Sequence, residues 1–80
     1  MSYYIEDDPT IVFMLGKIKE WKYSSDDILL LQVENYKKYI NEKIDKILDM
    51  VKKEPKSPFN ESYINCVNII LRRLEESQSE

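Results

Sequence analysis

The longest regular pattern of apolar positions in this chain lies in its middle third. Apolar side chains recur there at steps of three or four residues, at Leu29, Val33, Tyr36, Ile40, Ile44, Ile47 and Val51. This spacing places one continuous apolar stripe along a helix. Ser24 with Asp27 three residues later fits a capping box, and Ser25 is the alternative cap. The pattern predicts a long amphipathic helix over about residues 25–53.

Two shorter helical patterns flank the long one. Asp8 followed by Pro9 is typical of a helix start, and a helix over about residues 9–22 should follow. The prolines at positions 55 and 58 end the long helix, because neither can continue it. Asn60 is the expected cap of a third helix, over about residues 60–75. Its apolar face would comprise Tyr63, Ile64, Val67, Ile70, Leu71 and Leu74.

These elements predict an all-α fold, in which two shorter antiparallel helices fold onto the long central helix. Eighty residues are enough for a single small domain spanning 1–80. The two short helices together are about as long as the central one, so we expect them to meet near its middle. Residues 1–7 would form a flexible leader, in which Tyr3, Tyr4 and Ile5 either pack as an anchor or form a brief extended strand. Residues 76–80 would form a frayed acidic tail.

The chain has few residues that could carry chemistry. It contains no histidine, one cysteine and one glycine. A zinc site needs several histidine, cysteine or carboxylate ligands close together, and a cysteine nucleophile needs a base such as histidine to activate it. Cys66 is therefore expected to be a small buried hydrophobe. Gly16, alone in its helix, is expected to let another helix approach closely. We therefore predict no catalytic residues, no metal site, no cofactor and no small-molecule substrate: the protein is not expected to be an enzyme.

Charge and composition limit where the protein acts. The net charge is −3, with acidic and basic residues interspersed, so no uniform field would attract a polyanion. No apolar run is long enough to span a bilayer, and the N-terminus lacks the features of a signal peptide. A cytoplasmic protein is expected, or a nuclear one if the organism is eukaryotic. The absence of alanine and the abundance of isoleucine and lysine suggest an AT-rich genome, as in many viruses, archaea and low-GC bacteria.

The chain has more large apolar residues than the small core of the predicted fold can bury. This surplus favours a protein–protein interaction module. Its partner would be another protein or a second copy, bound through the apolar stripe of the long helix. Aromatic residues and arginines are common anchors at such interfaces. The candidate partner-binding residues are Trp21, Val33, Tyr36, Tyr39, Ile40, Arg72 and Arg73.

Two other functions fit the sequence. The first is a small nucleic-acid-binding protein that contacts phosphates through two lysine groups. Those groups comprise Lys17, Lys19 and Lys22 at the end of the first helix, and Lys52, Lys53 and Lys56 at the end of the second. Alternatively, these lysines only stabilise their helices, because cations interact favourably with the negative end of the helix dipole at the C-terminus. The second is a phage or viral regulator that inhibits a host protein, suggested by the composition and the acidic surface.

The region from Ile28 to Leu74 resembles the helical domain of GINS-family DNA replication subunits. The matching positions are Glu34, Tyr36, Tyr39, Ile40, Lys43, Ile44, Lys46 and Ile47, then the break over 55–58 and the closing helix over 63–74. The resemblance implies a non-catalytic accessory or scaffold subunit that contacts replication proteins.

Overall fold

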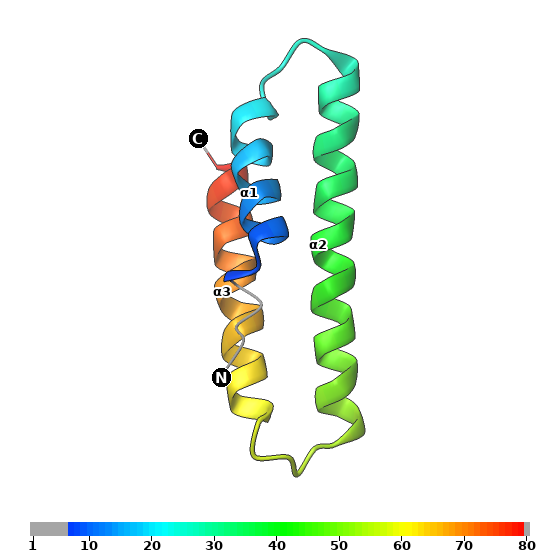
Figure 1. The fold of residues 1–80 in the computed structure, drawn as a ribbon, viewed down its shortest axis with the longest axis vertical. Helices are drawn as coiled ribbons and strands as arrows, with labels where there is room; N and C mark the ends of the chain where they lie inside the picture. Colours follow the sequence, from blue (N-terminus) through cyan, green and yellow to red (C-terminus); the bar gives the residue numbers. More distant parts are fainter. Residues whose placement is uncertain (1–6, 80) are drawn as a thin grey trace.

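The computed structural model describes residues 7–79, and in this part of the chain it contains three α-helices (Figure 1). They are α1 (Pro9–Trp21), α2 (Asp27–Lys53) and α3 (Asn60–Gln78). The predicted all-α fold with a long central helix is confirmed. The predicted leader lies outside the described residues, apart from Asp7.

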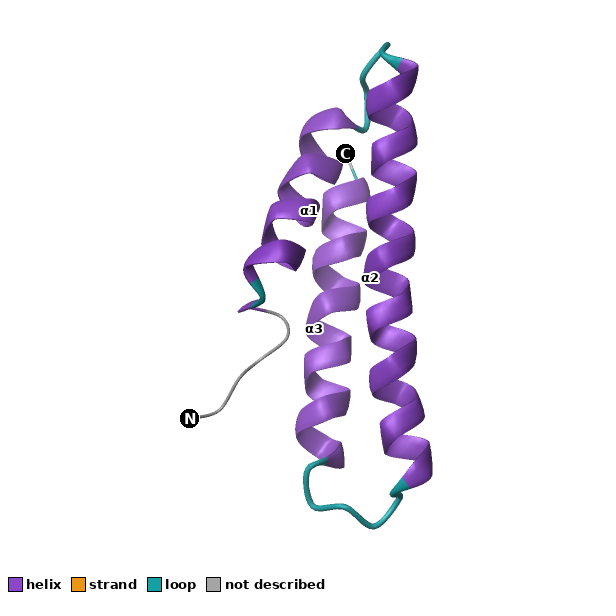
Figure 2. Cartoon of the chain, turned by 45° about the vertical axis from the view of Figure 1, so that its right-hand side comes forward, coloured by secondary structure: helices purple, strands orange, loops and turns teal. Residues whose placement is uncertain are grey.

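All three helices pack against one another, and the two shorter ones run antiparallel to α2. Figure 1 shows α1 beside the upper part of α2, and Figure 2 shows it next to the C-terminal half of α3. The expectation that α1 and α3 meet end to end is therefore wrong. With 13 and 19 residues, they extend about 20 and 28 Å, whereas the 27 residues of α2 extend about 40 Å. The short helices must therefore overlap, and they do so side by side.

The core contains one stripe from each helix. Ile11, Ile18, Ile40 and Ile70 are almost completely buried, so all three helices contribute to its centre. Met14, Trp21, Tyr36, Tyr39 and Tyr63 pack around it while remaining partly exposed. The other buried apolar residues are Leu15, Val33, Ile44, Ile47, Cys66, Val67 and Leu74. Cys66 is thus buried, as the sequence predicts.

The N-termini of the first two helices are capped by aspartates. Asp8 Oδ1 accepts a hydrogen bond from the Thr10 backbone N–H at 2.8 Å, as predicted. The cap of α2 is Asp26, whose Oδ1 accepts from the Ile28 N–H at 2.9 Å, and not Ser24 or Ser25. Ser24 Oγ instead accepts from the Asp26 N–H, which fixes the turn just before the helix. Helix α2 therefore begins two residues later than predicted.

Both ends of α3 differ from the prediction. Phe59, not Asn60, occupies the cap position, and it forms no side-chain cap hydrogen bond. The Asn60 Nδ2 instead donates to the Glu54 carbonyl at 2.8 Å, which braces the connection to α2. At the other end the helix continues to Gln78, so residues 76–78 of the predicted tail are helical. Ser77 is buried there, and its Oγ donates to the Arg73 carbonyl, satisfying part of the last turn.

Gly16 does not lie at a close helix contact. A Cβ atom added there would meet nothing within 4 Å, and the residue lines an open groove between α1 and α3. The expectation that Gly16 admits another helix of this chain is therefore wrong.

Replacing Gly16 by alanine should stabilise the protein by about 0.8–1 kcal/mol, because alanine has the higher helix propensity and its methyl group meets no atom. Urea denaturation would measure this change. Gly16→Ser is the control, with a smaller expected gain in keeping with the lower helix propensity of serine. A loss of stability in Gly16→Ala would contradict the open position of this residue.

Candidate protein-interaction surface

Aromatic side chains gather where α1 meets the upper half of α2. Phe13, Lys17 and Trp21 follow each other at intervals of four residues, so they share one face of α1. Tyr36 of α2 faces them. Its ring lies 6.4 Å from that of Phe13 in an edge-to-face arrangement, and 6.2 Å from that of Trp21 in a stacked one. We call these four residues the aromatic patch.

Lys17 lies between the two aromatic residues of α1. Its Nζ is 5.6 Å from the centre of the Phe13 ring and 5.1 Å from that of Trp21, both within the range of cation–π attraction. The same Nζ is 3.2 Å from Glu20 Oε2. Since the Glu20 side chain is largely exposed, this ion pair contributes little to stability. The patch therefore combines an apolar aromatic surface with one positive charge that a partner can reach.

Tyr39 and Lys43 continue the aromatic patch along α2. They follow Tyr36 by three and seven residues, so they lie on the same side of that helix. The Lys43 Nζ is 5.4 Å from the centre of the Tyr39 ring, which repeats the pairing of lysine and aromatic residue seen on α1. Both side chains are half-buried.

The structure brings together three of the predicted partner-binding residues. Trp21 and Tyr36 belong to the patch, and Tyr39 lies on the next turn. Val33 and Ile40, by contrast, are 3% and 0% exposed, because both point into the bundle core. A partner cannot reach these two side chains in the folded chain, so their assignment to the interface is corrected.

The two arginines lie apart from the aromatic patch. Arg73 faces the groove between α1 and α3, where its Nη1 is 4.0 Å from Asp7 Oδ1. Arg72 is exposed on α3. The structure therefore places Arg73 at the α1–α3 groove and the pair Trp21 and Tyr36 at the α1–α2 contact, so the predicted interface does not form one patch.

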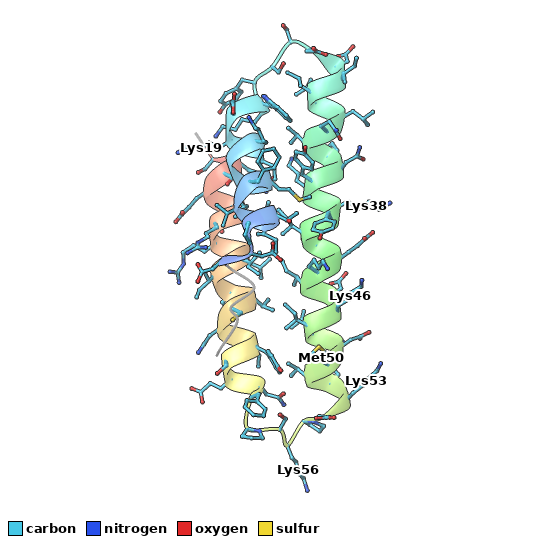
Figure 3. The ribbon with its side chains drawn as sticks, in the orientation of Figure 1. Lys19, Lys38, Lys46, Met50, Lys53 and Lys56 are labelled. Carbon is cyan, nitrogen blue, oxygen red and sulfur yellow. The ribbon has the colours of Figure 1, made fainter. Side chains whose placement is uncertain are left out.

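The predicted phosphate-contacting lysines do not form one surface. Lys17 belongs to the aromatic patch, Lys19 lines the α1–α3 groove, and Lys22 donates to the Ser79 carbonyl. Lys52, Lys53 and Lys56 are exposed at the opposite end of a bundle that is 47 Å long. Figure 3 shows the separation, with Lys19 near the top and Lys53 and Lys56 at the bottom.

Phe13 is the surface residue that the sequence did not single out. It lies in a run of five apolar residues that indicates burial on more than one side, yet it is 54% exposed. The four-residue spacing of Phe13, Lys17 and Trp21 is the signal that could have separated it from the buried residues of this run.

Among residues 7–79, no three side chains of the metal-binding types lie together, and no helix there has the length and apolarity to cross a membrane. No protein-family model, curated protein or solved structure matches this chain.

Proposed function

We propose that the protein is a non-enzymatic interaction module, an accessory or scaffold subunit that binds a protein partner through the aromatic patch. The observation that carries this proposal is the exposure of Phe13. Phe13 is 54% exposed, although its ring lies against that of Tyr36 and beside the Lys17 ammonium. The bundle core is closed without Phe13, so folding alone does not account for a phenylalanine here.

The composition of the patch supports a protein partner. Tryptophan and tyrosine are enriched among residues that dominate binding energy, and large rigid rings provide contact area at low entropic cost. Lys17 adds a positive charge between the Phe13 and Trp21 rings. The partner that fits best offers an apolar side chain to cover Phe13 and a carboxylate to meet the Lys17 ammonium.

A complex of the DNA replication machinery is the specific candidate for this partner, and it rests on the sequence resemblance alone. A regulator that inhibits a host protein would use the same patch, so the two functions differ in the partner's identity. The nucleic-acid alternative receives less support, because the two lysine groups lie at opposite ends of the bundle.

Replacing Phe13 by alanine should abolish most of the partner binding and leave the fold intact. A central aromatic anchor contributes 2 kcal/mol or more to binding, so we expect about 30-fold weaker binding. The test is affinity capture from native lysate, with quantitative mass spectrometry of the retained proteins. Phe59→Ala is the matched control, since Phe59 is also largely exposed, at 63% against 54% for Phe13, but lies at the far end of the bundle. Equal capture by the wild type and Phe13→Ala would contradict the proposal.

A second copy of the chain is the other possible partner. Size-exclusion chromatography with light scattering distinguishes it. A wild-type dimer that Phe13→Ala converts into a monomer would identify the patch as a homodimer interface.

A further inference from the structure

The aromatic patch and its continuation along α2 hold two ammonium groups against aromatic rings. Lys17 Nζ lies over the rings of Phe13 and Trp21, at 5.6 and 5.1 Å from their centres. Lys43 Nζ lies 5.4 Å from the centre of the Tyr39 ring. Both lysines are half-buried, because their side chains lie along this surface. A partner that covers these rings therefore also covers the two lysines.

The two covered ammonium groups determine the charge of the partner. Covering an ammonium group removes water from it, which is unfavourable unless an anion takes the place of the water. The carboxylate of Glu20 lies 3.2 Å from Lys17 Nζ, but its side chain is 61% exposed and the pair is weak. Among residues 7–79, no carboxylate oxygen lies within 4 Å of Lys43 Nζ. The partner must therefore bring a carboxylate to Lys43, and a second one reinforces the weak pair at Lys17.

The positions of the rings give the spacing of these carboxylates. The two rings beneath Lys17 both contact Tyr36, with ring centres 6.4 and 6.2 Å apart, so the Lys17 ammonium lies near the level of Tyr36. Lys43 lies over Tyr39, which follows Tyr36 by three residues, or about 4.5 Å along α2. On a helix, side chains with this separation occupy positions i and i+3 or i+4.

We propose that the partner binds this surface with an acidic amphipathic helix that lies along the α1–α2 contact. Two carboxylates one turn apart meet Lys17 and Lys43, and apolar side chains on the same face of the helix cover Phe13. Helices α1 and α2 pack side by side and antiparallel (Figure 1), and their surface ridges offer a third helix the usual packing geometry. The inference rests on the proposed function, because it names the partner chemistry of the same patch.

The arrangement of the rings favours this helix over a nucleic-acid strand, whose phosphates are also anions. Bases bind aromatic side chains by stacking on their ring faces. Here Tyr36 stacks on Trp21 with the ring planes at 24°, and the Lys17 ammonium lies over Trp21 and Phe13. The protein itself thus occupies part of the ring surface that bases would need. Aliphatic side chains, by contrast, can pack against the exposed edges of the rings.

Selection from a displayed peptide library tests the chemistry of the partner. The library holds helical peptides of about 18 residues, long enough to form helix in water, with one face randomised. The wild-type chain should enrich peptides with Asp or Glu at positions i and i+3 or i+4 and apolar residues beside them. The variant that combines Lys17→Glu and Lys43→Glu should enrich Lys or Arg at those positions instead, because its charges are reversed.

Lys38→Glu is the matched control for the charge reversal. Lys38 is an exposed lysine of α2 that projects away from α1 (Figure 3), so this variant should enrich the same acidic peptides as the wild type. For one enriched peptide, fluorescence anisotropy should show about tenfold weaker binding to Lys43→Glu and an unchanged affinity for Lys38→Glu. Circular dichroism of each variant checks that the helices are retained.

Enrichment of neutral or basic helices, or of no helical peptide, would overturn the acidic helix. Tighter binding of a thymidine oligonucleotide than of the acidic peptide would overturn it in favour of nucleic acid. A wild-type dimer that Phe13→Ala dissociates, with no peptide enriched, would assign the patch to a second copy. Lysate capture separates this inference from the proposed function. Capture lost in Phe13→Ala but kept in the charge-reversed variant would refute the acidic helix alone, whereas capture kept in both variants would refute both proposals.

Discussion

Replacing Ile40 by alanine is expected to destabilise the protein by about 2–5 kcal/mol, the usual cost of truncating a buried isoleucine. Ile40 is 0% exposed and lies halfway along α2, where all three helices meet. The change removes apolar contact and leaves a cavity that tightly packed neighbours fill only in part. A domain of 80 residues has little stability in reserve, so this loss removes a large fraction of its free energy of unfolding.

Urea denaturation, followed by circular dichroism and by the emission of the single tryptophan, would measure this loss. Leu31→Ala is the matched control on the same helix. Leu31 is 62% exposed, so its truncation should change the free energy of unfolding by no more than about 0.5 kcal/mol. If Ile40→Ala were as stable as the control and instead lost a binding partner, Ile40 would be an interface residue after all.

Replacing Trp21 by alanine is expected to cost about 2 kcal/mol of stability. The change removes the stacked contact with Tyr36, with ring centres 6.2 Å apart and planes at 24°, and the contact with the Lys17 ammonium. Aromatic pairs contribute about 0.5–1.5 kcal/mol beyond the area that they bury. Because Trp21 is only half-buried, the cost should stay below the 3–5 kcal/mol of a fully buried tryptophan.

A double-mutant cycle with Tyr36→Ala isolates the stacked pair. We expect a coupling free energy of about 0.5–1.5 kcal/mol between positions 21 and 36, measured by the same denaturation experiment with circular dichroism as the probe. Trp21→Phe should retain part of this coupling. Tyr23→Ala, at a neighbouring aromatic residue that is 69% exposed, should change stability little. Additive effects of Trp21→Ala and Tyr36→Ala would show that the stacked geometry contributes nothing beyond burial.

The sequence by itself determined the three helices and the direction of their apolar faces. These features depend on local physics. The apolar period of three and four residues, the Asp8–Pro9 start and the prolines after Lys53 act within one or two helical turns. A helix boundary was less well determined where several neighbouring residues could each act as the N-cap. Ser24, Ser25 and Asp26 can all cap a helix, and the structure selects Asp26.

Only the tertiary structure decided which apolar residues form the core and which stay at the surface. An apolar stripe shows that one face of a helix is to be buried, but it does not show which other element buries that face. Helix α3 continues to Gln78 because Ser77 becomes buried in the bundle, and the longer helix must then overlap α1. That overlap closes the core around Val33 and Ile40 and leaves Phe13 outside it. These outcomes depend on contacts between residues far apart in the sequence, which no local pattern contains.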